Sequence, residues 1–139
     1  MQRYMNAAVV YAVLAMVGGV FYREFTKFSD FSGQTVLSVV HPHYFMLGTV
    51  FFVLLALLER SFSFTGEKTG RVLVAYHVGL NLTCAMFVVR GVVQVLDVAL
   101  SSGADAAISG IAGLGHIVLG VSLVLMLLQV RRAVAGASK

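Results

Sequence analysis

The chain has 139 residues, of which 59% are hydrophobic and only 12% are charged. A soluble domain carries about 25% charged residues, so this composition excludes an ordinary water-soluble domain. The net charge of +4 does not indicate a nucleic-acid-binding protein, because the basic residues lie mostly at the ends of apolar segments. The single cysteine, Cys84, excludes an internal disulfide and a CxxC-type metal site, and we expect it to be a small buried residue.

Four apolar stretches follow one another along the chain, at residues 5–22, 38–58, 72–96 and 106–130. Each is long enough to cross a hydrocarbon core of roughly 30 Å as a helix. The connections between them are rich in Gly, Ser, Thr or charged residues, as loops that leave a bilayer should be. They are residues 22–35, 61–70 and 101–105. Short connections favour antiparallel neighbours, so the sequence predicts an all-α integral membrane protein, a single up-down-up-down four-helix bundle over residues 1–139.

The basic residues predict the orientation of this bundle. Arg23 and Lys27 lie in the first connection, whereas most of the others flank the opposite ends of the predicted helices. That larger group consists of Arg3, Arg60, Lys68, Arg71, Arg131, Arg132 and Lys139. Because cytoplasmic loops carry an excess of Lys and Arg, we expect both termini to be cytoplasmic, in a multi-pass protein of a bacterial cytoplasmic membrane.

Two histidines in the second apolar stretch, His41 and His43, are the first candidates for a functional site. An ionisable residue inside a membrane is a functional-site candidate by default, because burial there removes its hydration. Both residues lie near the outer end of their helix, roughly 5–8 Å deep at about 1.5 Å per residue. They are about 200° apart around a helix, so they face different directions. Pro42 between them should start or kink the helix.

Arg90 and His116 are expected in the same outer half of the bundle, at depths of about 10 Å and 15 Å. An arginine at this depth needs an anionic partner. The structural interpretation is a pair with Glu24 or with a backbone carbonyl. The functional interpretation is an acidic ligand group, such as a haem propionate.

The helical face around His116 carries almost only small residues: Ser109, Ala112, Gly113 and Gly120. Small residues allow helices to approach closely, which is common in membranes. They also leave an opening around an imidazole, as a flat macrocycle would require. The sequence leaves both interpretations open.

His77 belongs to a different part of the third helix. It lies about 20 Å along the helix axis from Arg90 and points away from it. With Asn81 and Cys84 it forms a mildly polar stripe, which predicts a hydrogen-bonded seam between helices.

The chain resembles a family of small four-helix bacterial membrane proteins known as a domain of unknown function. The resemblance covers nearly the whole length and is carried by the segments VYAVLAMVGGVFYREFTKF and LSVVHPHYFMLGTVFF, by VVRG with Gln94, and by GLGH. This family resemblance implies the four-helix membrane fold and supplies no activity.

A second, local resemblance suggests a cofactor. HPHY followed by GTVF is similar to the H-x-H-Y helix in the catalytic subunit of haem–copper oxidases. In that family the two histidines ligate two haems on opposite helix faces, and the subunit consists of three four-helix arcs. The resemblance therefore implies haem ligation by His41 and His43, and a homotrimer with haem between protomers. The copper-ligating histidines and the proton-channel residues of that family have no counterpart here, so we do not expect oxygen reduction.

These observations lead to one leading hypothesis, a membrane b-type haem-binding protein for electron transfer or for sensing or binding a small gas. Neutral imidazoles suit haem iron as axial ligands. We expect His43 and His116 to be the axial ligands, with His41 as the alternative or second-site ligand. Arg90 and Arg23 are expected to neutralise the propionates.

Two alternatives stay open. One is a copper or zinc site built from His41, His43 and His116, because imidazole suits both metals. The other is a non-catalytic accessory or assembly subunit of a membrane complex, in which the polar residues join the helices. No nucleophile–base, phosphate-loop or paired-carboxylate pattern is present, so a binding protein is favoured over an enzyme. The expected partners are the lipid bilayer, further copies of the chain, and a quinone or a redox protein.

Overall fold

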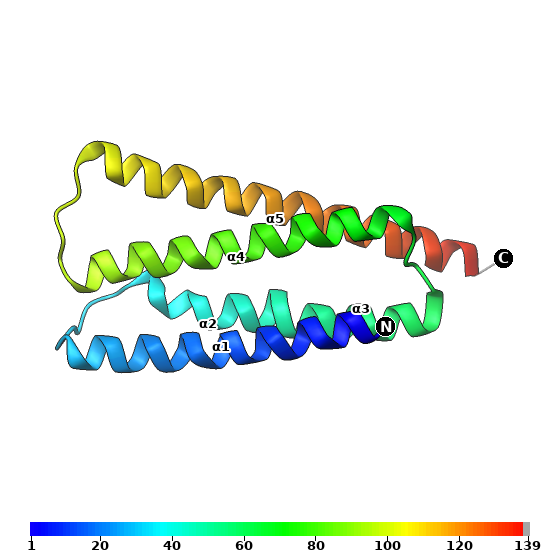
Figure 1. Ribbon diagram of the computed structural model, residues 1–139, viewed down its shortest axis with the longest axis horizontal. Helices are drawn as coiled ribbons and strands as arrows, with labels where there is room; N and C mark the ends of the chain where they lie inside the picture. The colour runs from blue at the N-terminus through cyan, green and yellow to red at the C-terminus, as the bar shows by residue number, and fades with distance from the viewer. Residues whose placement is uncertain (138–139) are drawn as a thin grey trace.

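A computed structural model describes residues 1–137, which form four long helical segments and no strands (Figure 1). The first, third and fourth segments are α1 (Gln2–Phe28), α4 (Glu67–Val95) and α5 (Ser102–Ala137). The second runs without interruption over Val36–Phe62 and consists of η1 (Val36–Val39), α2 (Val40–His43), η2 (Tyr44–Val50) and α3 (Phe51–Phe62). We call it the segmented helix. Each segment is long and apolar enough to span a membrane, which confirms the predicted four-helix membrane fold.

The helices extend further than the hydropathy of the sequence predicts. The predicted connection 22–35 is helical as far as Phe28, and α5 begins at Ser102 rather than at residue 106. Hydropathy marks only the part of a helix that lies in hydrocarbon, whereas backbone hydrogen bonding continues into the polar interface. At the start of α5, Asp105 also interacts favourably with the helix dipole. Lys139, which contributed to the predicted orientation, lies outside the described residues.

Both chain ends lie at one end of the molecule, together with the connection from α3 to α4 (Figure 1). We call this the terminal end, and we call the opposite end the distal end. Each connection contains one non-glycine residue with positive φ: Asp30 and Asp97 at the distal end and Ser63 at the terminal end. Aspartate tolerates this left-handed conformation better than most residues, because its short side chain can hydrogen-bond locally.

The four helices pack as two antiparallel pairs (Figure 1). α1 lies along the segmented helix, and α4 lies along α5. The α5 ribbon is inclined to the others and moves away from α4 toward the distal end. α4 and α5 are therefore apart at the distal end, where α4 still packs closely against the segmented helix at Gly91 and Leu37.

Two glycines set the close contact between α4 and α5. A Cβ added to Gly79 would lie 2.5 Å from the Leu119 backbone nitrogen, and one added to Gly115 would lie 2.8 Å from Thr83 Oγ1. Side chains at these positions would force the helices apart. Small residues at such crossings are typical of membrane helices, where van der Waals packing replaces the hydrophobic driving force.

The segmented helix changes its winding around Pro42. A 3₁₀ turn precedes α2, and a π-helical stretch of seven residues, η2, follows it. The π-helix is held from both sides: the Tyr76 hydroxyl donates to the Leu47 carbonyl at 2.7 Å, and Gly48 lies directly against the Tyr11 ring. π-helical insertions occur frequently at functional sites. Here the insertion directly follows His43.

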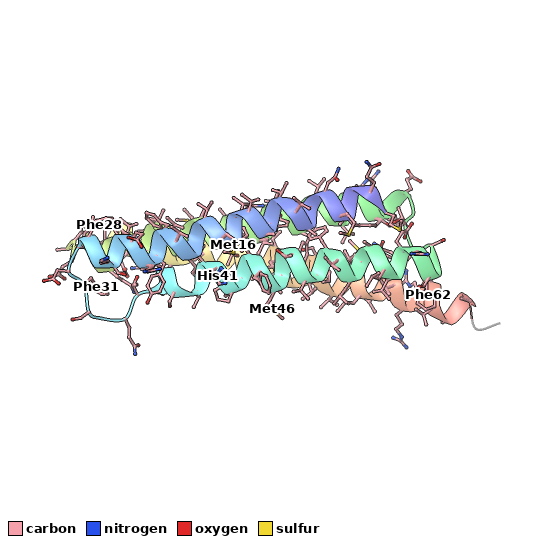
Figure 2. All side chains as sticks on the ribbon, turned by 90° about the horizontal axis from the view of Figure 1, so that it is seen from below. Met16, Phe28, Phe31, His41, Met46 and Phe62 are labelled. Carbon is pink, nitrogen blue, oxygen red and sulfur yellow. The ribbon has the colours of Figure 1, made fainter. Side chains whose placement is uncertain are left out.

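The surface of the bundle is apolar along most of its length. Figure 2 shows side chains projecting outward along α1 and the segmented helix, and two labelled residues there, Met16 and Met46, are 60% and 55% exposed. A soluble monomer rarely exposes an apolar area of this extent, so this surface faces lipid or other membrane helices.

The α4–α5 contact generates a prediction about stability. Gly79→Ala should destabilise the protein by about 1–3 kcal/mol, because the new methyl group meets the α5 backbone. Gly113→Ala is the matched control: nothing lies within 4 Å of its added Cβ, so it should cost no stability and gain up to about 1 kcal/mol of helix propensity. Cys84 is fully buried and is the only cysteine, so its labelling by a thiol-reactive dye on heating reports unfolding. Equal unfolding temperatures for the two variants would contradict the assigned contact.

Candidate functional site

His43 and His116 meet in the distal half of the bundle, where α5 moves away from α4. Their ring centroids are 6.4 Å apart and the ring planes are nearly perpendicular, at 86°. Phe87 of α4 lies edge-on to both rings, with centroid distances of 4.8 Å to His43 and 5.4 Å to His116. The three centroids form a triangle, so Phe87 lies beside the line between the histidines rather than on it. His43 is half-buried and His116 is exposed.

The backbone determines which nitrogen of each ring carries the proton. His43 Nδ1 lies 2.8 Å from the Val39 carbonyl, and His116 Nδ1 lies 2.9 Å from the Ala112 carbonyl. A carbonyl oxygen can only accept, so in each neutral ring Nδ1 donates its proton and Nε2 keeps a lone pair. Metal-ligating histidines are commonly oriented by a bond of this kind. Both rings are therefore held in the tautomer that leaves the lone pair of Nε2 available.

His41 faces the other side of its helix, as the spacing of the two histidines predicts. Its Nδ1 donates to the Ala15 carbonyl of α1 at 2.8 Å, and its ring stacks on Phe45 at 5.9 Å. Gly19 gives it room, because a Cβ there would lie 3.2 Å from Nδ1. In Figure 2 the label of His41 lies between α1 and the segmented helix. The structure thus brings His43 to His116 and directs His41 to α1.

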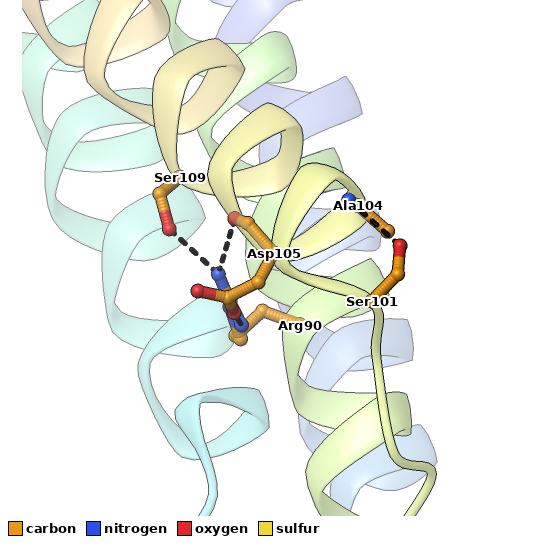
Figure 3. Close-up of polar contacts among 5 residues, drawn as sticks. All are labelled: Arg90, Ser101, Ala104, Asp105 and Ser109. Carbon is orange, nitrogen blue, oxygen red and sulfur yellow. Dashed lines mark hydrogen bonds and ion pairs between the residues drawn. The ribbon is translucent and has the colours of Figure 1, made fainter.

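Arg90 joins α4 to the first turns of α5 (Figure 3). Its Nη1 forms an ion pair with the Asp105 carboxylate, and its Nη2 donates to the Asp105 carbonyl at 3.2 Å and to Ser109 Oγ at 2.7 Å. The expected pair with Glu24 is wrong, whereas the expected carbonyl contact is present. Residues 102–105 belong to α5 rather than to a loop, and this helical turn brings Asp105 to Arg90. The Arg90 side chain is 24% exposed and that of Asp105 is 55% exposed.

Arg23 lies apart from this arrangement. Its side chain is 79% exposed and pairs with the neighbouring Glu24 at 3.5 Å. Within residues 1–137 the structure gives no contact between Arg23 and the histidines or Arg90. The position of Arg23 therefore does not support its predicted role of neutralising a haem propionate.

Among the small residues around His116, some pack against α4 and others face open space. Gly115 allows the close approach to Thr83, whereas Gly113 and Gly120 have open space where a side chain would lie. Thr83 is fully buried, and its hydroxyl oxygen has no hydrogen-bond partner among the described residues. It lies one helical turn from Phe87 on α4. Its oxygen is enclosed by the close contact with Gly115, and leaving such a hydroxyl unpaired in a membrane helix is costly.

His77 occupies the predicted interhelical seam. The Tyr11 hydroxyl of α1 lies 2.6 Å from His77 Nδ1, and the Asn81 amide nitrogen donates to the same hydroxyl at 3.0 Å. Cys84 is fully buried beside this seam, as expected. The separation of His77 from the other three histidines is confirmed, because no contact joins them in the described part of the chain.

Three parts of the site were not predicted from the sequence. They are Phe87 against both imidazoles, Asp105 as the partner of Arg90, and the π-helix after His43. Phe87 lies three residues before Arg90 on the same helical face, and this spacing could have suggested it. The π-helix has no comparable sequence signal.

The structure brings together two of the three predicted ligand histidines. No group of three or more His, Cys, Asp or Glu side chains that could hold a metal ion occurs within residues 1–137. The three-histidine set of His41, His43 and His116 is not brought together, because His41 is directed to α1. What remains is a pair of imidazoles with free Nε2 atoms.

Comparison with known proteins provides a family and no activity. No curated protein and no solved structure matches the chain. A family model described as "Protein of unknown function (DUF2871)" matches residues 1–133. This match agrees with the resemblance of the whole sequence to a family of small membrane proteins. Over nearly its entire length, therefore, the chain belongs to the DUF2871 family.

Proposed function

We propose that this protein is a membrane cytochrome that binds a b-type haem between His43 and His116 and transfers electrons. The observation that carries the proposal is the pair of imidazoles, each with its Nδ1–H bonded to a backbone carbonyl and its Nε2 free. Haem iron needs only two axial ligands from the protein, because the macrocycle supplies the other four. A zinc site needs at least three protein ligands, so the two-histidine set favours haem over zinc.

The spacing of the rings agrees with this assignment. A metal bonded at about 2 Å to one nitrogen of each of two opposed imidazoles holds the ring centroids roughly 6 Å apart. The observed separation is 6.4 Å. A macrocycle would extend around the iron on all sides, and Phe87 contacts both rings, so the Phe87 side chain would have to rotate away from the pair for haem to enter. Gly113 and Gly120 of α5 leave open space near His116.

Two axial histidines favour electron transfer over gas binding. A b-type haem bound here would supply reversible one-electron chemistry at its iron. His43 and His116 would occupy both axial positions and leave no open position for a gas molecule. The carbonyls of Val39 and Ala112 hold the rings in the ligating tautomer and increase the basicity of Nε2.

Arg90 acts chiefly as a positioning residue. Its ion pair with Asp105 and its bond to Ser109 hold the first turns of α5 against α4, two helical turns from His116. These contacts use three of the five N–H donors of the guanidinium. The two remaining donors suit a haem propionate as a second role. The charge of Arg90 is already neutralised by Asp105, so the first role is the stronger.

The exposure of His116 supports an oligomer. An imidazole that ligates haem at the surface of one chain needs a neighbour to exclude lipid from the macrocycle, and a second copy of the chain presents such a surface. The excess of basic residues at the terminal end supports cytoplasmic termini in a bacterial cytoplasmic membrane. The haem would then lie in the outer half of the bilayer.

The ligand assignment predicts the spectra of four single variants. His43→Ala and His116→Ala should each lower the haem content more than about tenfold or convert the haem to a five-coordinate form, because each removes an axial ligand. His41→Ala and His77→Ala are matched controls and should keep the wild-type spectrum, because both rings bond elsewhere. The measurement is the reduced-minus-oxidised absorption spectrum with a pyridine haemochrome assay. An unchanged spectrum in the His116 variant would remove this residue from the ligand set.

The positioning role of Arg90 predicts the outcome of a double-mutant cycle. Arg90→Gln and Asp105→Asn should each weaken haem retention about two- to fivefold, as expected for a partly exposed ion pair. The double variant should be no weaker than either single one, because both remove the same contact. Haem retention is measured by transfer of haem to apomyoglobin. If Asp105→Asn instead tightened haem binding, Arg90 would be a propionate ligand that Asp105 restrains.

A further inference from the structure

A second polar cluster lies between α1, α4 and the π-helix, toward the terminal end from the histidine pair. Asn81 is its centre. The Asn81 amide nitrogen donates to the His77 carbonyl at 2.8 Å and to the Tyr11 hydroxyl at 3.0 Å, and Asn81 Oδ1 accepts from the Tyr44 hydroxyl at 3.1 Å. The His77 carbonyl can only accept, so the amide nitrogen must face it, and the orientation of the amide is determined.

This orientation also determines the tautomer of His77. The Tyr11 hydroxyl accepts from Asn81, and its own proton has one acceptor within the cluster, His77 Nδ1 at 2.6 Å. His77 Nδ1 is therefore the unprotonated nitrogen, and Nε2 carries the hydrogen. This tautomer is the opposite of the one found in His41, His43 and His116. Since no described residue accepts from His77 Nε2–H, the chain of hydrogen bonds ends in a free donor.

His77, which carries this free donor, lines a groove of about 380 Å³ between α1 and α4. The α1 wall is formed by Asn6, Val10 and Leu14, and the α4 wall by His77 and Asn81. Val10 is 57% exposed on the lipid-facing surface, so the groove opens toward the bilayer. The His77 ring stacks on Phe52, at 4.9 Å and 11°, and also contacts the Tyr11 ring, at 5.6 Å and 19°. A rigid imidazole thus presents one N–H in a mostly apolar groove.

The chemistry of the groove restricts its ligand. Access from the bilayer requires a lipid-soluble molecule, and the N–H donor requires an acceptor on it. No lining residue is charged, which disfavours the phosphate of a phospholipid headgroup. The volume suits a single substituted ring, since ligand pockets range over about 300–1,000 Å³. We infer that this groove binds the headgroup of a lipid-soluble quinone, with His77 Nε2–H donating to one quinone carbonyl.

The role of this site rests on the proposed haem, since a quinone would be its electron partner, but the binding itself does not. Along α4, His77 and Phe87 are ten residues apart, or about 15 Å. The quinone and the haem would therefore occupy separate sites in one bundle. The two proposals can fail independently.

Photolabelling of the full-length protein tests the inference. The purified chain, in nanodiscs of quinone-free lipid, is irradiated with an azido-ubiquinone with and without excess ubiquinone-1. Label is expected in the peptides that contain residues 6–14 and 77–81, and ubiquinone-1 should suppress it. His77→Phe keeps the ring and its stacking but removes the donor, so labelling should fall about five- to tenfold.

Two further variants keep the test decisive. His41→Phe removes another half-buried histidine that stacks on an aromatic ring, and it should label as the wild type does. Val10→Phe fills the groove from its lipid-exposed rim without touching the hydrogen-bonded cluster, so it should abolish labelling even if His77→Phe fails to fold. Equal labelling of wild type, His77→Phe and Val10→Phe would overturn the inference. So would native mass spectrometry showing a phospholipid in the groove that ubiquinone-1 does not displace. If the quinone inference fails in either way while His77→Phe keeps the wild-type haem spectrum, the haem proposal is unaffected.

Discussion

Hydrocarbon offers no hydrogen-bond partners, so polar side chains within these helices are stabilised by partners inside the protein. Backbone carbonyls meet this need for His41, His43 and His116, each of which donates through Nδ1. His77 instead accepts at Nδ1 from Tyr11. The same constraint thus produces opposite tautomers at the two sites. It leaves a lone pair on His43 and His116, which suits a metal, and an N–H on His77, which suits a carbonyl.

The contact between α4 and α5 decides where these groups meet. Near the middle of the bundle, Gly79 and Gly115 bring the two backbones close together. Toward the distal end the helices spread, and longer side chains cross the gap: Phe87 reaches His116, and Arg90 reaches Asp105. A close contact near the middle and an ion pair toward the distal end hold α5 at a fixed inclination. The inclination brings His116 to His43 while leaving Gly113 and Gly120 uncovered.

The sequence was sufficient for the fold and for part of the site. Hydropathy identified four spanning helices, and helical spacing separated His41 from His43 and His77 from Arg90, because both signals depend only on local geometry. Hydropathy could not find Asp105, since a charge beside a polar turn is indistinguishable from a loop residue. The orphaned Thr83 hydroxyl and the free His77 N–H depend on packing between distant helices, and no local pattern encodes that packing.

The most direct test of the central claim is the absorption spectrum of the purified wild-type protein after haem addition, recorded oxidised and dithionite-reduced. Ligation by His43 and His116 predicts about one haem per site and a reduced spectrum with a sharp α-band, as expected of a six-coordinate b-type cytochrome. A protein that is isolated colourless and stays colourless after haem addition would contradict the account. The imidazole pair would then be assigned to helix packing alone.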